Sequence, residues 1–315
     1  MEVITVHPLI ELNNEIVEGT RKFYGMGDVK TINESLDAIQ DWTKKQPHLA
    51  SATEFMTRRY LETILILARG SVEGAKNKID KICTTRGLMP ELCMNFSVQE
   101  YSKLFECVRY IPLPKVCPTD KTRIMMTQFI PEKMDAFSIL SYFRYNLMVG
   151  EYRAHHDYTI AERFVIDLNN VSQMTIITKV NPIVVKKAEI IATEAYGTKI
   201  KGIHLLNAPP FVDKLIFLLK QALKEKVASR IHVHYTLEDF HKLIPKEVLP
   251  KDYGGDEPTL EKLSELWQET LRTEEATKII SNINNIIADE SKRPTNQFNQ
   301  EYMGMPGSFR KLNVD

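Results

Sequence analysis

Residues 199–230 read KIKGIHLLNAPPFVDKLIFLLKQALKEKVASR and hold a short apolar segment, a break and a strongly apolar helix. The run from Ile203 to Leu206 has the length and composition of a buried strand. Residues 207–210, NAPP, end this strand, because proline has no amide hydrogen to donate and restricts the residue before it. A helix is therefore predicted to start near Pro210.

The predicted helix has a broad apolar face. Asp213, Lys220 and Lys224 mark the opposite, charged side. Phe217 also falls on that charged side, where a surface helix normally carries a polar residue. A large exposed apolar side chain beside a broad apolar face indicates a surface that meets an apolar partner.

Length and composition set limits on the class of protein. The chain has 315 residues, of which 43% are hydrophobic, so it is long enough for two domains or for one domain with helical additions. Its 41 basic and 41 acidic residues argue against nucleic acid as a partner. The N-terminus lacks a signal-peptide pattern and no apolar run is long enough to span a membrane, so a soluble, cytoplasmic protein is expected. Four widely spaced cysteines are predicted to be free buried thiols.

Residues 1–95 are predicted to form a helical block. Ile32–Trp42, Phe55–Ala68 and Val72–Cys83 have helical spacing of apolar residues, and Ser71 precedes the third as an N-cap. Pro90 is predicted to close the block.

Residues 96–257 alternate between strand and helix patterns. The predicted strands after residue 120 are Lys121–Ile130, Arg163–Leu168, the run ending at Leu206, and Ile231–Tyr235; the helices between them are Met134–Tyr152, Val171–Ala195 with an interruption at Pro182, and the helix after Pro210. This alternation predicts an α/β fold with a mainly parallel sheet. Residues 258–315 are expected to form two helices, Leu260–Leu271 and Glu274–Ala288, followed by an extended polar tail that Phe309 and Leu312 could dock.

Motifs for nucleotide, hydrolase or zinc-peptidase chemistry do not occur in the sequence. His204, His232 and His234 are interpreted as strand residues whose polar ring atoms are satisfied by neighbouring groups, rather than as metal ligands. His155 and His156 are interpreted as surface residues, again in preference to metal ligands. Asp167 is interpreted as a turn-capping residue rather than a catalytic carboxylate. The chain is therefore expected to have no metal site, no cofactor and no enzymatic activity.

Basic residues gather at the two ends of the opening stretch. Lys199 and Lys201 precede the strand, and Lys224, Lys226 and Arg230 follow the helix. They could hold a phosphorylated headgroup or an anionic membrane, or they could form a solvated face that stabilises the helix end.

Several segments together resemble the CRAL-TRIO lipid-binding family, in the branch of the retinaldehyde-binding and α-tocopherol transfer proteins. The segments are KGIHLLNAPPF, KEKVASRIHVH, LPKDYGG, FVIDLNN, VNPIVVKKAEI and the leader RGSVEGAKNKIDKICTTRGLMPEL. The closing GSFRKLNVD resembles insect members. The joint order of these segments makes the resemblance more specific than any one of them.

The resemblance implies three regions: residues 1–95 as the helical N-terminal region, 96–257 as the lipid-binding domain and 258–315 as C-terminal helices and tail. It also implies one enclosed apolar pocket, with the sheet as its floor and Pro209–Val227 as a mobile lid that opens at a membrane. Matching the family's pocket gives these ligand-binding positions: Phe143, Leu147, Ile166, Ile191, Ala192, Ile203, Phe211, Leu215 and Leu218.

The same resemblance places a phosphoinositide headgroup at Lys199, Lys226 and Arg230, and lipid contact at Phe217. A fourth basic position of the family matches Arg69 only across a shortened segment. The implied function is that of a cytosolic, monomeric carrier. It would bind one hydrophobic molecule such as a retinoid, carotenoid or tocopherol and transfer it between membranes by transient peripheral association. A regulatory or scaffold protein that senses phosphoinositide with the same fold is the alternative.

Overall fold

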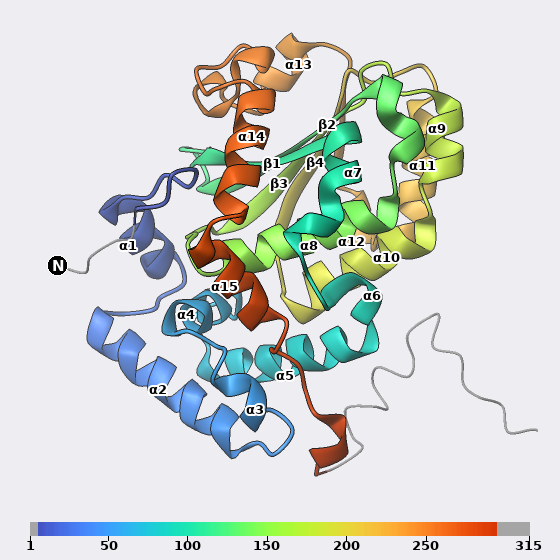
Figure 1. Ribbon diagram of the computed structural model, residues 1–315. Coiled ribbons are helices and arrows are strands. Elements are labelled where there is room, and N and C mark those ends of the chain that lie inside the picture. Colours follow the sequence, from blue (N-terminus) through green and yellow to red (C-terminus); the bar gives the residue numbers. More distant parts are fainter. Residues whose placement is uncertain (1–5, 295–315) are drawn as a thin grey trace, which may run out of the picture.

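The computed structural model describes residues 6–294 (Figure 1). The predicted tail, with Phe309, Leu312 and the closing GSFRKLNVD, lies outside the described residues. Within them, helices surround one sheet, and the N-terminal helices gather at one end of it.

The sheet has five strands in the order β1-β2-β3-β4-β5. These are β1 (Val108–Val116), β2 (Thr122–Phe129), β3 (Ala161–Asp167), β4 (Ile200–Leu206) and β5 (Ile231–His234). β1 pairs with β2 in the antiparallel sense, and every pairing from β2 to β5 is parallel. The predicted mixed α/β class with a mainly parallel sheet is therefore confirmed.

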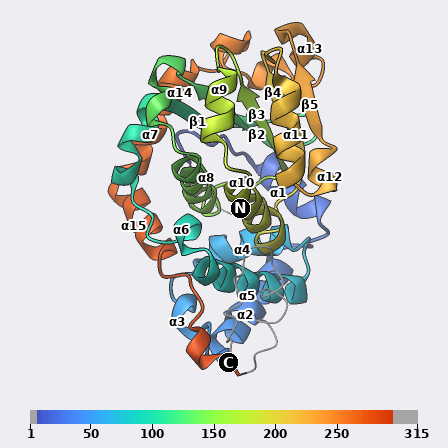
Figure 2. The same ribbon diagram turned by 90° about the vertical axis from the view of Figure 1, so that its right-hand side faces the viewer.

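The helices of the N-terminal block form the lower part of Figures 1 and 2. Ser71 caps the fifth, since its Oγ accepts a hydrogen bond from the Gly74 amide at 3.0 Å. Pro90 begins a short helix rather than only closing the block, because proline is tolerated in a first helical turn. The bounds are α1 (Asn14–Phe23), α2 (Val29–Lys45), α3 (Ala50–Thr53), α4 (Arg58–Leu67), α5 (Val72–Leu88) and α6 (Pro90–Cys93).

The remaining helices cover the two faces of the sheet. Their bounds are α7 (Ser102–Cys107), α8 (Ile139–Arg153), α9 (Gln173–Lys179), α10 (Pro182–Ile190), α11 (Val212–Ala222), α12 (Glu225–Ala228), α13 (Leu237–His241), α14 (Leu260–Leu271) and α15 (Glu274–Ile283). A π-helical turn, Ile191–Ala195, continues α10. Helices α8 to α11 face the viewer in Figure 2, whereas α14 lies in front of the sheet in Figure 1.

The alternation of side chains along the strands divides the core. Phe164 and Ile203 are register partners and point to the face that α8, α10 and α11 cover. Val165 and His204, the next pair, point to the other face, where Phe240 lies edge-on to the His204 ring. The cavity described below lies on the first of these faces.

The edge strand β1 was not among the predicted strands. It contains Pro112 and Pro114, which remove two backbone donors, and its register with β2 shifts between Pro112 and Val116. An edge strand tolerates these prolines because one of its sides has no neighbouring strand. The indole Nε1 of Trp267 in α14 donates to the Pro112 carbonyl at 3.2 Å.

The predicted lid helix is shorter than expected. α11 ends at Ala222, and Leu223 is extended, with φ −90° and ψ 147°, before α12 begins. The break turns Leu223 toward the interior of the molecule, where it joins Leu219 in a cavity wall. A continuous helix from Pro210 to Val227 is therefore wrong.

The C-terminal part of the described chain returns to the N-terminal block. The Ala288 amide donates to the Cys83 carbonyl at 3.3 Å, and the Arg86 guanidinium donates to the Ile283 carbonyl at 2.7 Å. Beyond them Arg293 pairs with Asp80 at 2.8 Å. The segment 283–293 therefore packs against α5 of the N-terminal block.

Candidate ligand cavity

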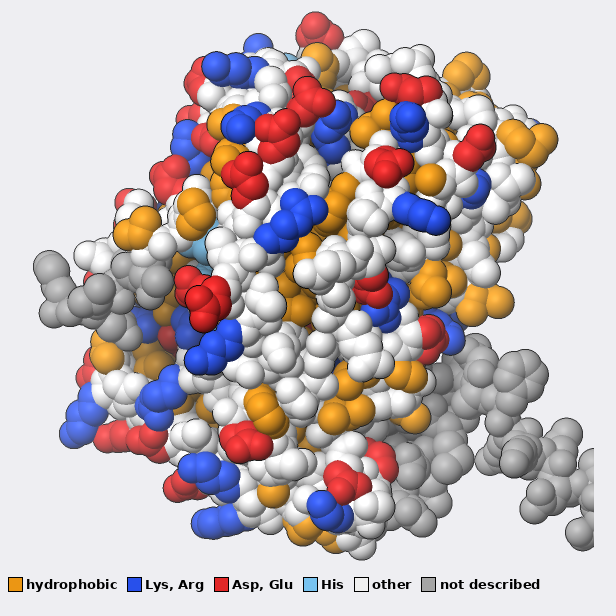
Figure 3. Space-filling model, in the orientation of Figure 1, with side chains coloured by type: hydrophobic (Ala, Val, Ile, Leu, Met, Phe, Trp, Pro, Cys, Tyr) orange, Lys and Arg blue, Asp and Glu red, His pale blue; other side chains and the backbone are white. Residues whose placement is uncertain are grey.

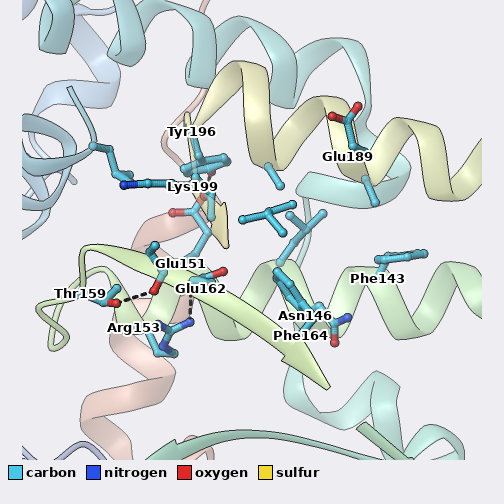
Figure 4. A pocket seen from close by; sticks show the side chains of 18 of the residues that line it. Phe143, Asn146, Glu151, Arg153, Thr159, Glu162, Phe164, Glu189, Tyr196 and Lys199 are labelled. Atoms are coloured by element: carbon cyan, nitrogen blue, oxygen red, sulfur yellow. Dashed lines mark hydrogen bonds and ion pairs between the residues drawn. The ribbon is translucent and has the colours of Figure 1, made fainter. Parts of the chain in front are cut away.

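A cavity of about 260 Å³ lies between the sheet and the helices α4, α8, α10 and α11. Most of its wall is apolar: Phe164, Ile166 and Ile203 of the sheet form one side, and Leu219 and Leu223 close the opposite side. Figure 4 shows Phe143, Phe164 and Asn146 toward one end, with Glu189 on that side, and Glu151, Arg153, Glu162, Lys199 and Tyr196 toward the other. The arrangement suits a molecule that is mainly hydrophobic.

The structure brings five of the nine predicted pocket residues together in this wall. They are Phe143, Leu147, Ile166, Ala192 and Ile203. Their contact with a ligand stays a prediction.

The other four predicted residues are not part of the wall. Ile191 is fully buried with Met89 and Leu92, because the π-helical turn rotates it away from Ala192. Phe211, Leu215 and Leu218 pack with the apolar residues under α11. The lid helix reaches the cavity one turn later than expected, through Leu219 and Leu223.

Sequence reasoning missed two parts of the wall. Ile64 and Leu67 of α4 contribute from the N-terminal block, which the sequence analysis did not connect with the pocket. Asn146 and Gly150 of α8 lie three and seven residues after Phe143. That helical spacing would have identified both as members of the same cavity-facing stripe.

A buried ionic network closes the polar end of the cavity. Arg153 pairs with Asp157 at 2.7 Å and with Glu162 at 2.9 Å, and Arg123 pairs with the same Asp157 at 2.5 Å. Burial opposes ionisation of Asp157, but the two guanidinium groups outweigh it and hold its pKa well below the usual range. Asp157 is therefore a charged structural anchor.

A second buried ion pair joins the N-terminal block to α8. The Oε1 atom of Glu151 accepts from the Arg86 guanidinium and from the Tyr196 hydroxyl. Burial acts to lower the pKa of Arg86, and the Glu151 carboxylate reverses this so that the net shift is upward. The carboxylate lines the cavity and is only 3% exposed.

Comparison with known proteins identifies the segment that contains most of this site. Residues 118–255 match the family model described as the CRAL/TRIO domain. This segment is similar to the CRAL/TRIO domain. It includes β2 to β5 and the helices α8 to α13.

Two curated relatives match this chain over 95 and 82 residues. A mouse (Mus musculus) protein named alpha-tocopherol transfer protein-like is 33% identical over 95 residues, which is 30% of this chain and 27% of that protein. Clavesin-1 of Rattus norvegicus is 33% identical over 82 residues, 26% of this chain and 23% of that protein. The chain thus spans about a quarter of the length of these relatives. The crystal structure of Sfh5 superimposes with a TM-score of 0.45 at 14% identity, covering 80% of this chain and 91% of that one.

The basic residues predicted to bind a headgroup lie around one edge of the segment 118–255. Lys199 lines the cavity and its Nζ lies 5.6 Å from the centre of the exposed Phe23 ring. Arg230 is half-buried and donates to the Ile200 carbonyl, whereas Lys226 is exposed on α12. Part of the donor capacity of Arg230 is therefore already used by the backbone.

The N-terminal block adds basic residues near the same edge. Lys78 lies against Gly197. A Cβ atom built on this glycine would be 1.9 Å from the Nζ of Lys78, which is too close for a side chain there. Burial lowers the pKa of Lys78, and the positive charges of Lys81 and Arg69 lower it further. Arg69 is thus close enough to Lys78 to affect its charge, and its match to the family stays a prediction.

Large apolar side chains are exposed on the helices next to the lid. Phe217 on α11 is 63% exposed, as its position on the charged side predicts. Met174 and Ile177 of α9 and Ile183 of α10 are also exposed, and the sequence analysis did not single them out. Figure 3 shows hydrophobic side chains on the right, where α9 and α11 lie in Figure 1.

The residues considered for catalysis or metal binding are only partly satisfied by neighbours, since the Nε2 atoms of His155, His156 and His204 are buried and have no hydrogen-bond partner among residues 6–294. Nδ1 of His204 and Nε2 of His234 are 2.9 Å apart, and Asp167 accepts from the Asn169 amide at 2.9 Å in the predicted turn-capping role. His155 and His156 are half-buried rather than on the surface, because α8 ends against the N-terminal block. Residues 6–294 hold no group of three metal-ligating side chains, and none of their helices could cross a membrane.

The four cysteines, Cys83, Cys93, Cys107 and Cys117, are free and buried as predicted. Burial raises the pKa of Cys83 to about 12, so its thiol stays protonated at neutral pH.

Proposed function

We propose that the chain is a carrier that binds one hydrophobic small molecule in the cavity and transfers it between membranes. The observation that carries this proposal is the apolar cavity of about 260 Å³ beside a segment that is similar to the CRAL/TRIO domain. A curated relative named alpha-tocopherol transfer protein-like supports a ligand such as a tocopherol, retinoid or carotenoid. The proposal includes no catalytic step and no cofactor.

Desolvation supplies enough free energy for capture. A ligand that buries about 400 Å² of apolar surface gains on the order of 10 kcal/mol at roughly 25 cal/mol per Å², before the entropic costs of binding. Such binding is tight and reversible, as transfer requires.

Release would occur through movement of α11. Leu219 and Leu223 form the wall on the α11 side, and the helix ends in an extended residue instead of continuing into α12. Phe217, Met174 and Ile177 would enter the lipid interface when the protein docks. We propose a monomeric cytosolic protein that associates with membranes peripherally and transiently.

Ligand identification tests the carrier. The protein is purified from cells under native conditions, extracted with organic solvent and analysed by mass spectrometry. In parallel, the delipidated protein is titrated with retinoids, carotenoids, tocopherol and phosphoinositides. One stoichiometric lipid is expected; a folded sample that binds none of these or other lipids would overturn the proposal.

The basic group favours a second candidate, a regulatory protein that senses a phosphoinositide. Lys199, Lys226 and Arg230 would hold the headgroup, with Arg69 and Lys78 nearby. Charge reversal of Lys226 distinguishes the two functions, since this side chain is exposed and makes no ion pair within residues 6–294. The change should abolish membrane localisation of a sensor but only slow transfer by a carrier.

A further inference from the structure

The cavity wall contains several hydrogen-bond donors that the protein itself already uses. Thr63 donates to the Ala154 carbonyl at 2.7 Å, and Thr159 donates to the Ala161 carbonyl at 2.8 Å. The other engaged donors are the hydroxyls of Tyr142 and Tyr196, which bond to Thr127 at 2.7 Å and to Glu151, and the guanidinium of Arg153, which pairs with Asp157 and Glu162. These groups are therefore held by the protein.

Three further donors of the wall have no such partner. Tyr110, Thr198 and Lys199 form no side-chain hydrogen bond or ion pair with any residue between 6 and 294. Their surroundings differ, because Tyr110 is only 4% exposed, whereas Thr198 is half-buried and Lys199 is exposed. Water can satisfy the two donors that lie nearer the surface, so the Tyr110 hydroxyl gains most from a ligand.

The ring of Tyr110 is fixed between the sheet and α8. Tyr110 lies in β1 opposite Thr127 of β2, and its ring is edge-on to those of Tyr142 and Tyr145 in α8, with ring centroids 6.0 and 6.1 Å apart. Edge-on aromatic contacts favour one orientation of the ring. The hydroxyl therefore has a defined position before a ligand enters.

The Tyr110 oxygen is open to the cavity. By contrast, Asn146 Oδ1 and Glu151 Oε2 are completely enclosed and without a partner, so a ligand cannot reach them. The Tyr110 oxygen also lacks a partner, but it is not enclosed in this way, and the residue lines the cavity. A ligand in the cavity can therefore contact it.

The Tyr110 phenol stays protonated. Burial raises its pKa well above the usual value, and the negative charge of Glu162 raises it further, whereas Arg153 acts in the opposite direction. Tyr110 is therefore a neutral donor at physiological pH, and its unpaired proton requires an acceptor.

The other available donors lie elsewhere in the cavity. Thr198 and Lys199 precede β4, which β2 and β3 separate from β1, so at about 4.8 Å per strand the backbones are about 14 Å apart. Asn146 lies with Phe143 and Phe164 in Figure 4, and its amide nitrogen is the remaining donor of the wall. Variants of these residues can therefore be distinguished from a variant of Tyr110.

We infer that the Tyr110 hydroxyl donates a hydrogen bond to an oxygen acceptor of the ligand, and so selects lipids with a carbonyl, ester, ether or hydroxyl oxygen over plain hydrocarbons. The contact is buried, where an unpaired hydroxyl is most unfavourable. The inference deepens the proposed carrier function and rests on it, because it assigns a polar contact to the molecule in the same cavity.

The test compares dodecane with methyl decyl ketone, which has the same number of carbon atoms. Each competes with a fluorescent lipid for the delipidated full-length protein and for its Tyr110→Phe variant, which loses the hydroxyl and keeps the ring. Comparing the ratio of the two dissociation constants between the proteins cancels differences in ligand solubility. In Tyr110→Phe this ratio should shift against the ketone by about three- to tenfold, the range that one net hydrogen bond supplies, while dodecane binds as before or more tightly.

Tyr145→Phe is the matched control, because Tyr145 is also buried beside Tyr110 but lies outside the cavity wall. It should leave the ratio within about twofold of the parent value. Lys199→Met and Asn146→Leu test the alternative donors and should also leave the ratio within this limit. Circular dichroism verifies that each variant is folded.

The outcomes separate the two proposals. An unchanged ratio in Tyr110→Phe, or an equal shift in Tyr145→Phe, overturns the inference and leaves the carrier standing. A shift confined to Lys199→Met or Asn146→Leu also overturns it, since the acceptor then lies at another donor. Failure of both ligands to displace the probe from folded protein counts against the carrier itself.

Discussion

Lys224, just beyond the end of α11, pairs with Glu194 of the π-helical turn, with Nζ and Oε1 2.5 Å apart. The pair connects the segment after the lid helix to the element that carries Ala192 of the cavity wall. It therefore spans the place where the proposed lid would separate from the rest of the domain.

Lys224→Glu should speed ligand release by breaking this pair. Both side chains are substantially exposed, so the pair contributes no more than about 1 kcal/mol and the rate should rise by no more than about fivefold. Stopped-flow transfer of a fluorescent ligand to acceptor vesicles measures the rate. The double variant Lys224→Glu with Glu194→Lys should restore the original rate. A rate unchanged in the single variant would mean that the pair plays no part in opening.

Phe217→Asp should reduce liposome association without lowering ligand capacity in solution. The charge opposes insertion of α11 into the interface, while the side chain points away from the cavity wall. Vesicle co-sedimentation measures binding. Val29→Asp is the control: Val29 is also exposed, but it begins α2 in the N-terminal block, where an acidic residue suits the helix start. Equal sedimentation of Phe217→Asp and the parent protein would exclude this role for the lid.

Ala192→Phe should fill part of the cavity. Ala192 lies in the wall, so the larger ring would occupy ligand space and lower the amount of lipid bound per protein. The free energy of unfolding should fall by no more than about 1–3 kcal/mol. Ala50→Phe, at an exposed site in α3, is the control for a general effect of the ring. Undiminished lipid content in Ala192→Phe would place the ligand elsewhere.

Glu151→Gln should destabilise the fold by about 3–5 kcal/mol, because it leaves the buried Arg86 without its counter-charge. Urea unfolding followed by circular dichroism gives the free energy. The exposed pair of Lys262 and Glu265 offers the comparison, since Glu265→Gln should change stability by less than about 1 kcal/mol. Similar losses in both variants would contradict a special structural role for the Arg86–Glu151 pair.

Stability should fall as the pH drops from 6.5 toward 4. Burial lowers the pKa of His7 and of His155 from 6.5 to about 4, so between these values the unfolded chain binds protons that the folded protein does not. The contribution of these neutral histidines is complete above pH 6.5 and is lost as the pH approaches 4. Urea midpoints across this range measure the effect, and His155→Asn should flatten the dependence. A midpoint that stays constant from pH 7 to 5 would rule out the titration.

The sequence allowed prediction of the elements whose pattern is local. Strands β2 to β5 and helix α14 follow from apolar periodicity, and Ser71 follows from capping chemistry. β1 was missed because its prolines oppose a strand assignment, and only its edge position makes them acceptable. The same distinction between local and tertiary causes applies to the candidate site.

The family resemblance placed Phe143 and Leu147 in the pocket, and both line the cavity, but their contact with a ligand stays a prediction. The break at Leu223 has no signal in the local apolar pattern of the sequence. The resemblance assigned the wall to Leu215 and Leu218, whereas α11 reaches the cavity through Leu219 and Leu223.

The attachment of residues 283–293 to α5 has a practical consequence for how this protein can be divided into fragments. The wall of the cavity extends beyond residues 118–255, the segment that matches the family model. Ile64 and Leu67 of the wall lie in the N-terminal block. Residues 283–293 pack against α5 of that block. A fragment cut at the family boundaries would expose the interior on one side. The minimal lipid container should include both outer segments, at least from Asn14 to Arg293.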